Sequence, residues 1–269
     1  MQSGRRRDPF QYGGEVFLEA SRFLQRVVPG ASHSQAPERV SPVAGARATC
    51  GLIRGLPRIE VRLTGEPAGE RLSAHFGHRL WGIRHARVAQ GVLVLPAEPG
   101  RYARGRSRQA VRTNMRKARA AGIACRPLDS AWTQRATWQG LGRRVDTADE
   151  DRFAIPGDRW WGAFAPDGGP VAFAQVTVDR EIALLQTLAS LDRPTRYLLH
   201  TQVVEALVGA NVRYLVASAP MAPLLEPALQ YWQRLLGYQI ANLSVSTASP
   251  ARWELRVAEV DAEPAVSTP

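Results

Sequence analysis

The stretch VAFAQVTVDREIALLQTLASLDRPTRYLLHTQVVEALVGA, residues 171–210, decides the fold. Its first half holds two apolar runs joined by Asp179-Arg180-Glu181, a pattern typical of a β-hairpin. Its second half predicts a helix, because Pro194 suits a first helical turn and apolar residues recur on one face. Those residues are Leu199, Val203, Leu207 and Ala210. Two antiparallel strands followed by a helix indicate a mixed α/β fold.

The same alternation of strands and helices continues on both sides of this stretch. Before it, we expect a strand over 123–127, a helix over 131–144 and a strand at 160–164 that enters the hairpin turn PDGG. After it, we expect a strand over 212–218, a helix over 224–237 that ends at Gly237, and closing strands over 238–245 and 252–259. The predicted order is strand, helix, three antiparallel strands, helix, strand, helix and two strands.

The first hundred residues predict a smaller α/β unit. An amphipathic helix is expected over 15–28 and a long loop over 29–47, which is rich in Pro, Ser, Gly and Ala. Alternation in RIEVRL places Ile59, Val61 and Leu63 on one face of a strand, and GVLVLP, residues 91–96, indicates a buried strand. At the other end, the composition of residues 259–269 predicts a disordered tail.

A strongly basic run, RYARGRSRQAVRTNMRKAR, occupies residues 101–119 and contains no acidic residue. It predicts a helix over 104–121 that stops at Gly122, with Val111, Met115 and Ala118 on the face that docks on protein. On such a helix six arginines, including Arg101, share an arc of about 120°. Their planar forks suit a polyanionic backbone, although a merely solvated basic face is the alternative. The candidate contact residues are Arg104, Arg108, Arg112, Arg116, Lys117 and Arg119.

Composition narrows the class of protein and its partners. The chain has 269 residues, 45% of them hydrophobic, with a formal net charge of +11 and a pI near 10.8. These values favour a globular protein that associates with RNA, DNA or anionic surfaces. No apolar stretch reaches the ~20 residues of a membrane span, and no signal-peptide core follows the basic start, so we expect a cytoplasmic protein.

Cysteines and histidines predict neither a disulfide framework nor a metal site. Cys50 and Cys125 lie far apart in the sequence and neither belongs to a metal-binding spacing. His75, His78 and His85 cluster without a cysteine or a nearby carboxylate, which favours partly exposed histidines on an amphipathic segment over a zinc site.

Three features together resemble a known superfamily. The element order, the loop between Leu191 and Tyr197 and the segment YWQRLLGYQI, residues 231–240, resemble the GNAT acyltransferase fold. Within it, the run from Arg112 to Ile123 is similar to the linker of the Fem-type aminoacyl-tRNA-dependent peptidyl transferases. The resemblance covers residues 101–257.

The resemblance implies a GNAT-like mixed sheet flanked by helices over 123–258. A basic linker helix over 101–122 would precede it, and a reduced, degenerate GNAT-like region would occupy 1–100. The implied activity is the transfer of an amino acid from aminoacyl-tRNA to the amine of a peptide or small molecule. The implied partner is therefore tRNA, which serves as a co-substrate, and no resident cofactor is expected.

Two other functions stay open. Acetyl-CoA-dependent members of the fold carry a Q/R-x-x-G-x-G/A loop after the fourth strand, where glycines let the backbone approach the pyrophosphate. Here only Arg193 fits that pattern, since Arg196 and Leu198 occupy the glycine positions and their Cβ atoms would crowd the approach. Arg193 and Arg196 are then either a clamp for a tRNA phosphate or surface residues. A non-catalytic RNA-binding module is the third possibility.

The resemblance also implies where the reaction takes place. In the GNAT fold it occurs where the fourth and fifth strands splay, which puts Gln186 and Thr187 near the reacting carbonyl. Gln175 and Gln186 interrupt apolar strands, so each amide needs partners and is either structural or substrate-binding. Because aminoacyl transfer to an amine is downhill, the protein mainly has to position the amine and stabilise the oxyanion.

Candidate proton-transfer residues and aromatic residues complete the predicted site. His200, one turn into its helix, is either a general base or a histidine satisfied by its neighbours. Tyr231 and Tyr238 are candidate proton donors to the leaving group, with hydrophobic packing as the alternative. An aromatic wall for substrate or for the terminal adenine of tRNA is one interpretation of three tryptophans, and core packing is the other. They are Trp160, Trp161 and Trp232.

Overall fold

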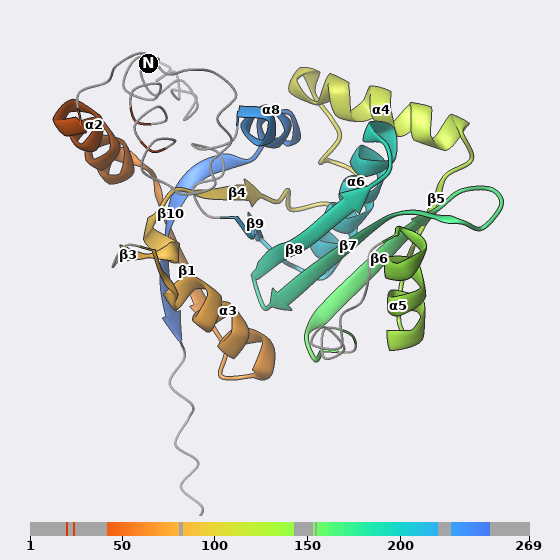
Figure 1. Ribbon diagram of the computed structural model, residues 1–269, viewed down its shortest axis with the longest axis horizontal. Helices are drawn as coiled ribbons and strands as arrows, with labels where there is room; N and C mark the ends of the chain where they lie inside the picture. The colour runs from red at the N-terminus through yellow and green to blue at the C-terminus, as the bar shows by residue number, and fades with distance from the viewer. Residues whose placement is uncertain are drawn as a thin grey trace, which may run out of the picture.

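A single eight-stranded mixed sheet organises the computed structural model, which describes residues 20, 24, 42–80, 83–142, 153, 155–219 and 227–247 (Figure 1). The strand order is β1-β10-β4-β9-β8-β7-β6-β5. The strands are β1 (Arg58–Leu63), β4 (Gln90–Val94), β5 (Ala124–Pro127), β6 (Asp158–Phe164), β7 (Pro170–Asp179), β8 (Ile182–Ser190), β9 (Tyr214–Ala217) and β10 (Gln239–Thr247). A separate small hairpin joins β2 (Arg79–Leu80) to β3 (Ile83–Arg84).

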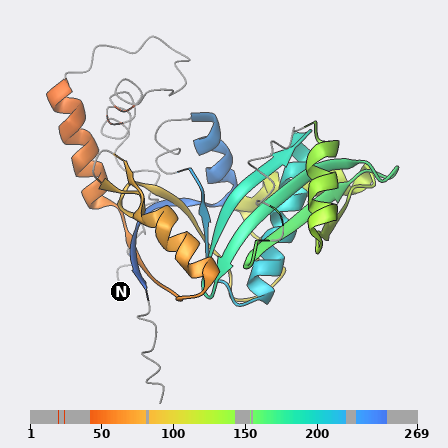
Figure 2. The same cartoon turned by 60° about the horizontal axis from the view of Figure 1, so that its bottom comes forward.

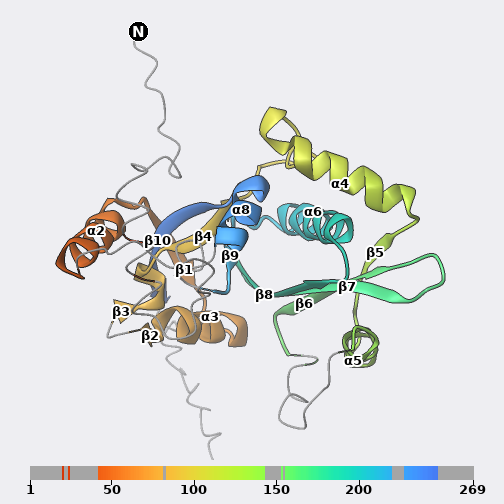
Figure 3. The ribbon, with the colours of Figure 1, turned by 45° about the horizontal axis from the view of Figure 1, so that its top comes forward.

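Helices cover both faces of the sheet. Figure 3 shows α4 (Gln109–Ala120), α6 (Arg193–Gly209) and α8 (Pro227–Leu236) together on one face. On the other face lie α3 (Pro67–Gly77) and α5 (Ala131–Gly140), which Figure 2 brings to the front. At the β1 end of the molecule is α2 (Pro42–Gly55), and two 3-10 turns, η2 (His85–Arg87) and η3 (Arg106–Arg108), precede β4 and α4.

The predicted element order from residue 123 to residue 247 is confirmed. Strands β6, β7 and β8 form the expected antiparallel set, and α6 crosses over to β9, which pairs parallel with β8. Local signals explain the boundaries: Ser130 and Thr133 form a capping box at the start of α5, and Gly237 ends α8 with φ +81°. The fold class is therefore a mixed α/β sheet flanked by helices, as expected.

Three predicted boundaries are wrong. Residues 42–47 belong to α2 instead of the expected loop, since Pro42 stands at a helix start and the following alanines favour a helix. The helix expected over 131–144 ends at Gly140, followed by Gly142 with φ +72°. The basic helix begins at Gln109 after η3, because Gly105 turns the chain with φ +89°. Arg101 and Arg104 therefore precede the helix and do not extend its row of arginines.

Some expectations concern residues outside the described part. The strand at 252–259 and the tail at 259–269 are among them. Of the helix expected over 15–28, only Ala20 and Leu24 are described, and both are helical and buried. Helix α3 and the small β2–β3 hairpin were not expected from the sequence.

The first hundred residues contribute two strands to the common sheet. Strand β4 lies between β9 and β10, antiparallel to both, and β1 pairs parallel with β10 at the edge. The division of the chain at residue 100 remains a prediction. None of the described helices combines the length and the apolar content that crossing a bilayer requires.

Candidate functional site

The two central parallel strands separate at one point. Strands β8 and β9 pair over Ile182–Leu185 and Tyr214–Ala217 and then diverge. At the same place β8 carries an extra residue, since Gln175 lies opposite Thr187 while Val176 lies opposite Leu185. That extra residue is Gln186, and a β-bulge leaves such a residue without a partner in the ladder.

A small cavity of about 160 Å³ opens at this separation, between β8, β9, α6 and α8. Gln186 and Thr187 line it, as the resemblance implies, together with Arg196 and Ser218. The Ser218 hydroxyl donates to the Gln186 carbonyl oxygen at 3.1 Å, which bridges the diverging strands. Trp232 and Gln233 complete the wall on the α8 side.

Three residues that line this cavity each carry a buried polar atom without a hydrogen-bond partner among the described residues. The atoms are Nε of Arg196, Nε1 of Trp232 and Oε1 of Gln233. Buried polar groups in native proteins are almost always hydrogen-bonded, to protein or to ordered water or ligand. All three residues line the cavity, although the Gln233 amide also lies against Gly91 of β4.

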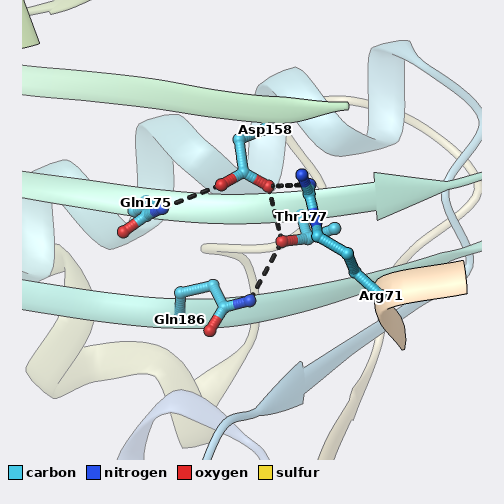
Figure 4. A network of polar contacts seen from close by, with 5 residues as sticks. All are labelled: Arg71, Asp158, Gln175, Thr177 and Gln186. Atoms are coloured by element: carbon cyan, nitrogen blue, oxygen red, sulfur yellow. Dashed lines mark hydrogen bonds and ion pairs between the residues drawn. The ribbon is translucent and has the colours of Figure 1, made fainter. Parts of the chain in front are cut away.

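Gln186 is held by a chain of hydrogen bonds on the opposite face of the sheet (Figure 4). Its Nε2 donates to Oγ1 of Thr177 at 3.1 Å, and that hydroxyl donates to Oδ1 of Asp158 at 2.6 Å. Asp158, which is 3% exposed, also accepts from Gln175 Nε2 at 2.8 Å and from Arg71 Nη2 at 2.6 Å. The chain fixes the amide of Gln186 with its nitrogen towards Thr177, so its oxygen remains able to accept a hydrogen bond.

Gln175 has a structural role, because it belongs to the hydrogen-bond network around Asp158 that holds Gln186. Its side chain is 5% exposed and its amide is used by Asp158. Of the two glutamines that interrupt the strands, Gln186 lines the cavity and Gln175 does not.

His200 lies in a closed cluster behind Trp232 and does not itself line the cavity. Its side chain is 1% exposed, with Nε2 3.1 Å from the Tyr238 hydroxyl and Nδ1 3.3 Å from the Tyr102 hydroxyl. Burial, and then the charge of Arg108, lowers the pKa of His200 to about 3. Burial likewise raises the pKa of Tyr238 and of Tyr102 above the ordinary value. The arrangement matches a histidine satisfied by its neighbours.

Arg193 and Arg196 have different surroundings although both belong to the first turn of α6. Arg193 is exposed, lies 5.7 Å from the Tyr197 ring centroid, and has a pKa raised by hydrogen bonds to Tyr197 and Tyr231. Arg196 lines the cavity with its Nε buried. Only Arg196 is therefore placed to meet an anionic group there.

The start of α6 is already occupied by a carboxylate. Asp192 is the N-cap, and its two oxygens accept from the backbone N–H and the hydroxyl of Thr195, both at 2.7 Å. A pyrophosphate bound at this helix start would meet that negative charge and the side chains of Arg196 and Leu198. The residues present do not fit a CoA pyrophosphate.

The three predicted tryptophans do not form one wall, although Trp160 and Trp161 both line a further cavity of about 630 Å³. Trp161 packs in the core beneath α4 and α6, while Trp160 stacks on Phe173 in a cluster on the other face. Trp232 alone of the three lines the cavity. Tyr231 is 51% exposed and sits beside Arg234.

The basic helix α4 docks as predicted, with Val111, Met115 and Ala118 buried. Its cations divide into two groups. Arg108 donates to the Leu235 carbonyl at 3.2 Å, and Arg112 donates to the carbonyls of Ala103 and Gly105 at 2.9 and 2.5 Å. Arg108 thus links η3 to the end of α8, and Arg112 holds the segment that enters α4. The other predicted contact residues, whose exposed side chains form no hydrogen bond or ion pair with the described residues, are Arg104, Arg116, Lys117 and Arg119.

The described histidines and cysteines form neither a metal site nor a disulfide. Nδ1 of His78 lies 3.2 Å from Nε2 of His85, and burial lowers the pKa of His75 and of His85. Within the described residues, no group of three His, Cys, Asp or Glu side chains could hold a metal ion. Both cysteines are free, and burial raises the pKa of the Cys125 thiol to about 11.

Several residues of the site were not expected from the sequence. Ser218 and Gln233 line the cavity, and Arg71 and Asp158 support it from far away in the chain. One signal existed for Gln233, a polar residue at a position of α8 that packs inwards. The pairing of Arg71 with Asp158 has no local signal, since 87 residues separate them.

Comparisons with known proteins give only distant likenesses. No protein-family model and no curated protein matches the chain. Among solved structures, the C-terminal domain of a protein assigned as a lysylphosphatidylglycerol synthetase from Agrobacterium fabrum aligns with a TM-score of 0.42 and 14% identity, over 57% of this chain and 58% of that one. The L-PGS of Bacillus licheniformis aligns with a TM-score of 0.37 and 11% identity, over 55% and 48%.

A GCN5-related N-acetyltransferase from Kribbella flavida aligns with a TM-score of 0.36 and 16% identity, over 56% of this chain and 54% of that one. The chain thus spans about half the length of these proteins. Since these TM-scores are below 0.5, only the mixed α/β fold, which rests on the strand order, is assigned, and the GNAT likeness stays a prediction. A Fem-type relationship stays a prediction.

Proposed function

We propose that the chain is an amide-forming acyltransferase that moves an aminoacyl group from tRNA to the amine of a peptide or small molecule. The observation that carries this proposal is the cavity at the separation of β8 and β9. There Gln186 stands in a β-bulge, and three buried polar atoms have no partner among the described residues.

The chemistry proposed needs placement more than a strong base. The acceptor amine attacks the ester carbonyl, the C–N bond forms, the ester C–O bond breaks, and the amine proton leaves with the ribose hydroxyl. The proposal requires the attacking amine to reach the free oxygen of the Gln186 amide through the separation of β8 and β9 and to donate a hydrogen bond to it. Arg196 can meet an anionic group of the donor, and a backbone N–H turned out of the ladder at the bulge can stabilise the oxyanion.

The proposed donor is supported by charge and by the start of α6. Arg116, Lys117 and Arg119 are exposed on α4, with no acidic residue in that helix. The Asp192 cap argues against acetyl-CoA as donor, because its carboxylate stands where a pyrophosphate would need backbone N–H groups. Acetyl transfer from CoA is therefore the second candidate, and RNA binding without catalysis is the third.

Incubation with charged total tRNA and, separately, with acetyl-CoA, followed by mass spectrometry of a panel of amines, tests the proposal. We expect an aminoacylated amine from the tRNA arm alone. Acetylated product from the second arm would favour the acetyltransferase. Tight binding of tRNA with no product in either arm would favour the RNA-binding module.

A matched pair of variants on one helical turn links the product to the cavity. Arg196→Gln should lower transfer by about 10-fold or more, since a charge-assisted hydrogen bond to the donor is lost. Arg193→Gln removes the same charge outside the cavity and should lower transfer by less than about threefold. Equal losses in the two variants would mean that the cavity does not hold the donor.

A further inference from the structure

A second cavity lies at the other side of β4, away from the separation of β8 and β9. Its volume is about 290 Å³, and it sits between the end of α2, the start of β1, η2 and β10. The seven lining residues include three arginines and no carboxylate. It shares no lining residue with the cavity of Gln186.

The three arginines come from three different elements. Arg54 is in the last turn of α2, Arg58 begins β1, and Arg87 ends η2. All three are exposed, and none forms a hydrogen bond or an ion pair with the other residues that the structure describes. Like charges gathered around one concavity repel one another, and an anion placed between them would remove that repulsion.

The wall of this cavity is fixed by an amide that is itself satisfied. Asn242 donates from Nδ2 to the Ile53 carbonyl at 2.7 Å and accepts at Oδ1 from the Ala89 N–H at 3.4 Å. These bonds tie the end of α2 and the chain before β4 to β10. The arginines therefore project from a rigid frame, and the exposed Ser244 adds a hydroxyl beside them.

A purely structural role explains only one of the three arginines. Arg54 stands at the C-terminal end of α2, where a cation complements the helix dipole. Arg58 begins a strand, and the three-residue turn η2 that Arg87 ends is too short for a comparable dipole. A neighbouring cavity of about 170 Å³ shares Arg87 and Ser244 and adds Arg84, so the basic surface continues along β10.

We propose that this cavity is a binding site for the phosphate groups of a small organic phosphate. Guanidinium forks bind phosphate oxygens bidentately, and three of them around one concavity suit a diphosphate better than a single carboxylate. Ile53 and Leu243 provide apolar surface for the organic part of the ligand. The volume is at the lower end of that of small-molecule sites, which favours a small ligand over a long polymer.

Calorimetric titration with inorganic pyrophosphate and with ADP tests this site. We expect both to bind, ADP more tightly because of the apolar surface. The double variant Arg58→Gln with Arg87→Gln should weaken binding about 10-fold or more, since two charge-assisted contacts are lost. Circular dichroism checks that the double variant is folded.

The matched control is Arg62→Gln, an exposed arginine of the same strand that does not line the cavity. It should leave binding unchanged, and an equal loss there would reveal unspecific attraction and overturn the proposal. Binding of a short RNA without binding of pyrophosphate or ADP would also overturn it. Arg196→Gln should not affect this titration, so the site stands or falls independently of the proposed acyl transfer.

Discussion

Two buried polar clusters, one around His200 and one around Gln186, differ in whether their hydrogen bonds are complete. Both ring nitrogens of His200 lie within hydrogen-bond distance of a tyrosine hydroxyl, from Tyr102 and Tyr238. The chain that starts at Asp158 passes through Thr177 to the amide nitrogen of Gln186, a residue that lines the cavity and whose amide oxygen has no such bond. The first cluster stabilises the packing of α6 on α8 and β10, and the second leaves one amide oxygen of Gln186 without a bond among the described residues.

The difference shows that a titratable residue near a predicted site is weak evidence for catalysis. His200 was a natural candidate from the sequence, yet its pKa is lowered to about 3, so it stays neutral near pH 7 with its nitrogens engaged. A neutral amide with one unengaged oxygen is the better candidate to orient an amine. The bonds to Thr177 and Asp158 fix the orientation of that amide.

The largest expected effect separates the two clusters by activity. Gln186→Ala should lower aminoacyl transfer about 10² to 10³-fold, as the loss of one positioned hydrogen-bonding group does in other acyl-transfer sites. His200→Asn should lower transfer by less than about threefold. The measurement is the rate of amide formation with charged tRNA, using variants that melt within a few degrees of the wild type.

The opposite ranking would reverse the comparison. If His200→Asn abolished transfer while Gln186→Ala retained it, the closed cluster would contain the general base and Gln186 would be structural. Both variants keep the charge of the site unchanged at neutral pH, so a change in tRNA affinity cannot imitate either result.

The second prediction concerns the support behind Gln186. Asp158→Asn should lower the free energy of unfolding by about 2 to 3 kcal/mol, because a buried amide cannot accept from Arg71, Thr177 and Gln175 together. Urea denaturation followed by tryptophan fluorescence measures this loss. A change below about 0.5 kcal/mol would mean that the network contributes little to the fold.

The sequence was most informative where local patterns determine structure. The strand-helix order of residues 123–247, the turn at Gly237 and the docking face of α4 follow from periodicity and from glycine. The position of β4 between β9 and β10, and the contact between Arg71 and Asp158, depend on long-range packing that no local pattern encodes. Similarly, Arg108 and Arg116 are equivalent by spacing, although only Arg108 reaches a carbonyl of another helix.

The third prediction uses pH. The pKa of His200 in the folded chain, about 3, lies below its ordinary value of 6.5, so the unfolded chain binds a proton that the folded chain excludes. Stability from this residue is therefore complete above pH 6.5 and is lost as the pH falls towards 3, by at most about 1.4 kcal/mol per pH unit. His200→Asn should be less stable than the wild type at pH 7 and show a shallower loss between pH 6 and 4. Parallel slopes for the two proteins in urea titrations would contradict a buried neutral histidine.

The smallest expected effect distinguishes the fastening arginines of α4 from the free ones. Arg112 donates to two carbonyls in the chain that enters the helix, so Arg112→Ala should lower the free energy of unfolding by about 0.5 to 1.5 kcal/mol. Arg116→Ala removes the same exposed charge from the same helix without a fastening contact and should change stability by less than about 0.5 kcal/mol.

For tRNA binding the order should reverse, because a side chain committed to backbone carbonyls has fewer donors for phosphate. Removing Arg116 should lower the slope of log affinity against log salt by about one contact, and removing Arg112 should lower it less. Equal salt slopes for the two variants, with equal stability, would show that the carbonyl contacts of Arg112 do not restrict it.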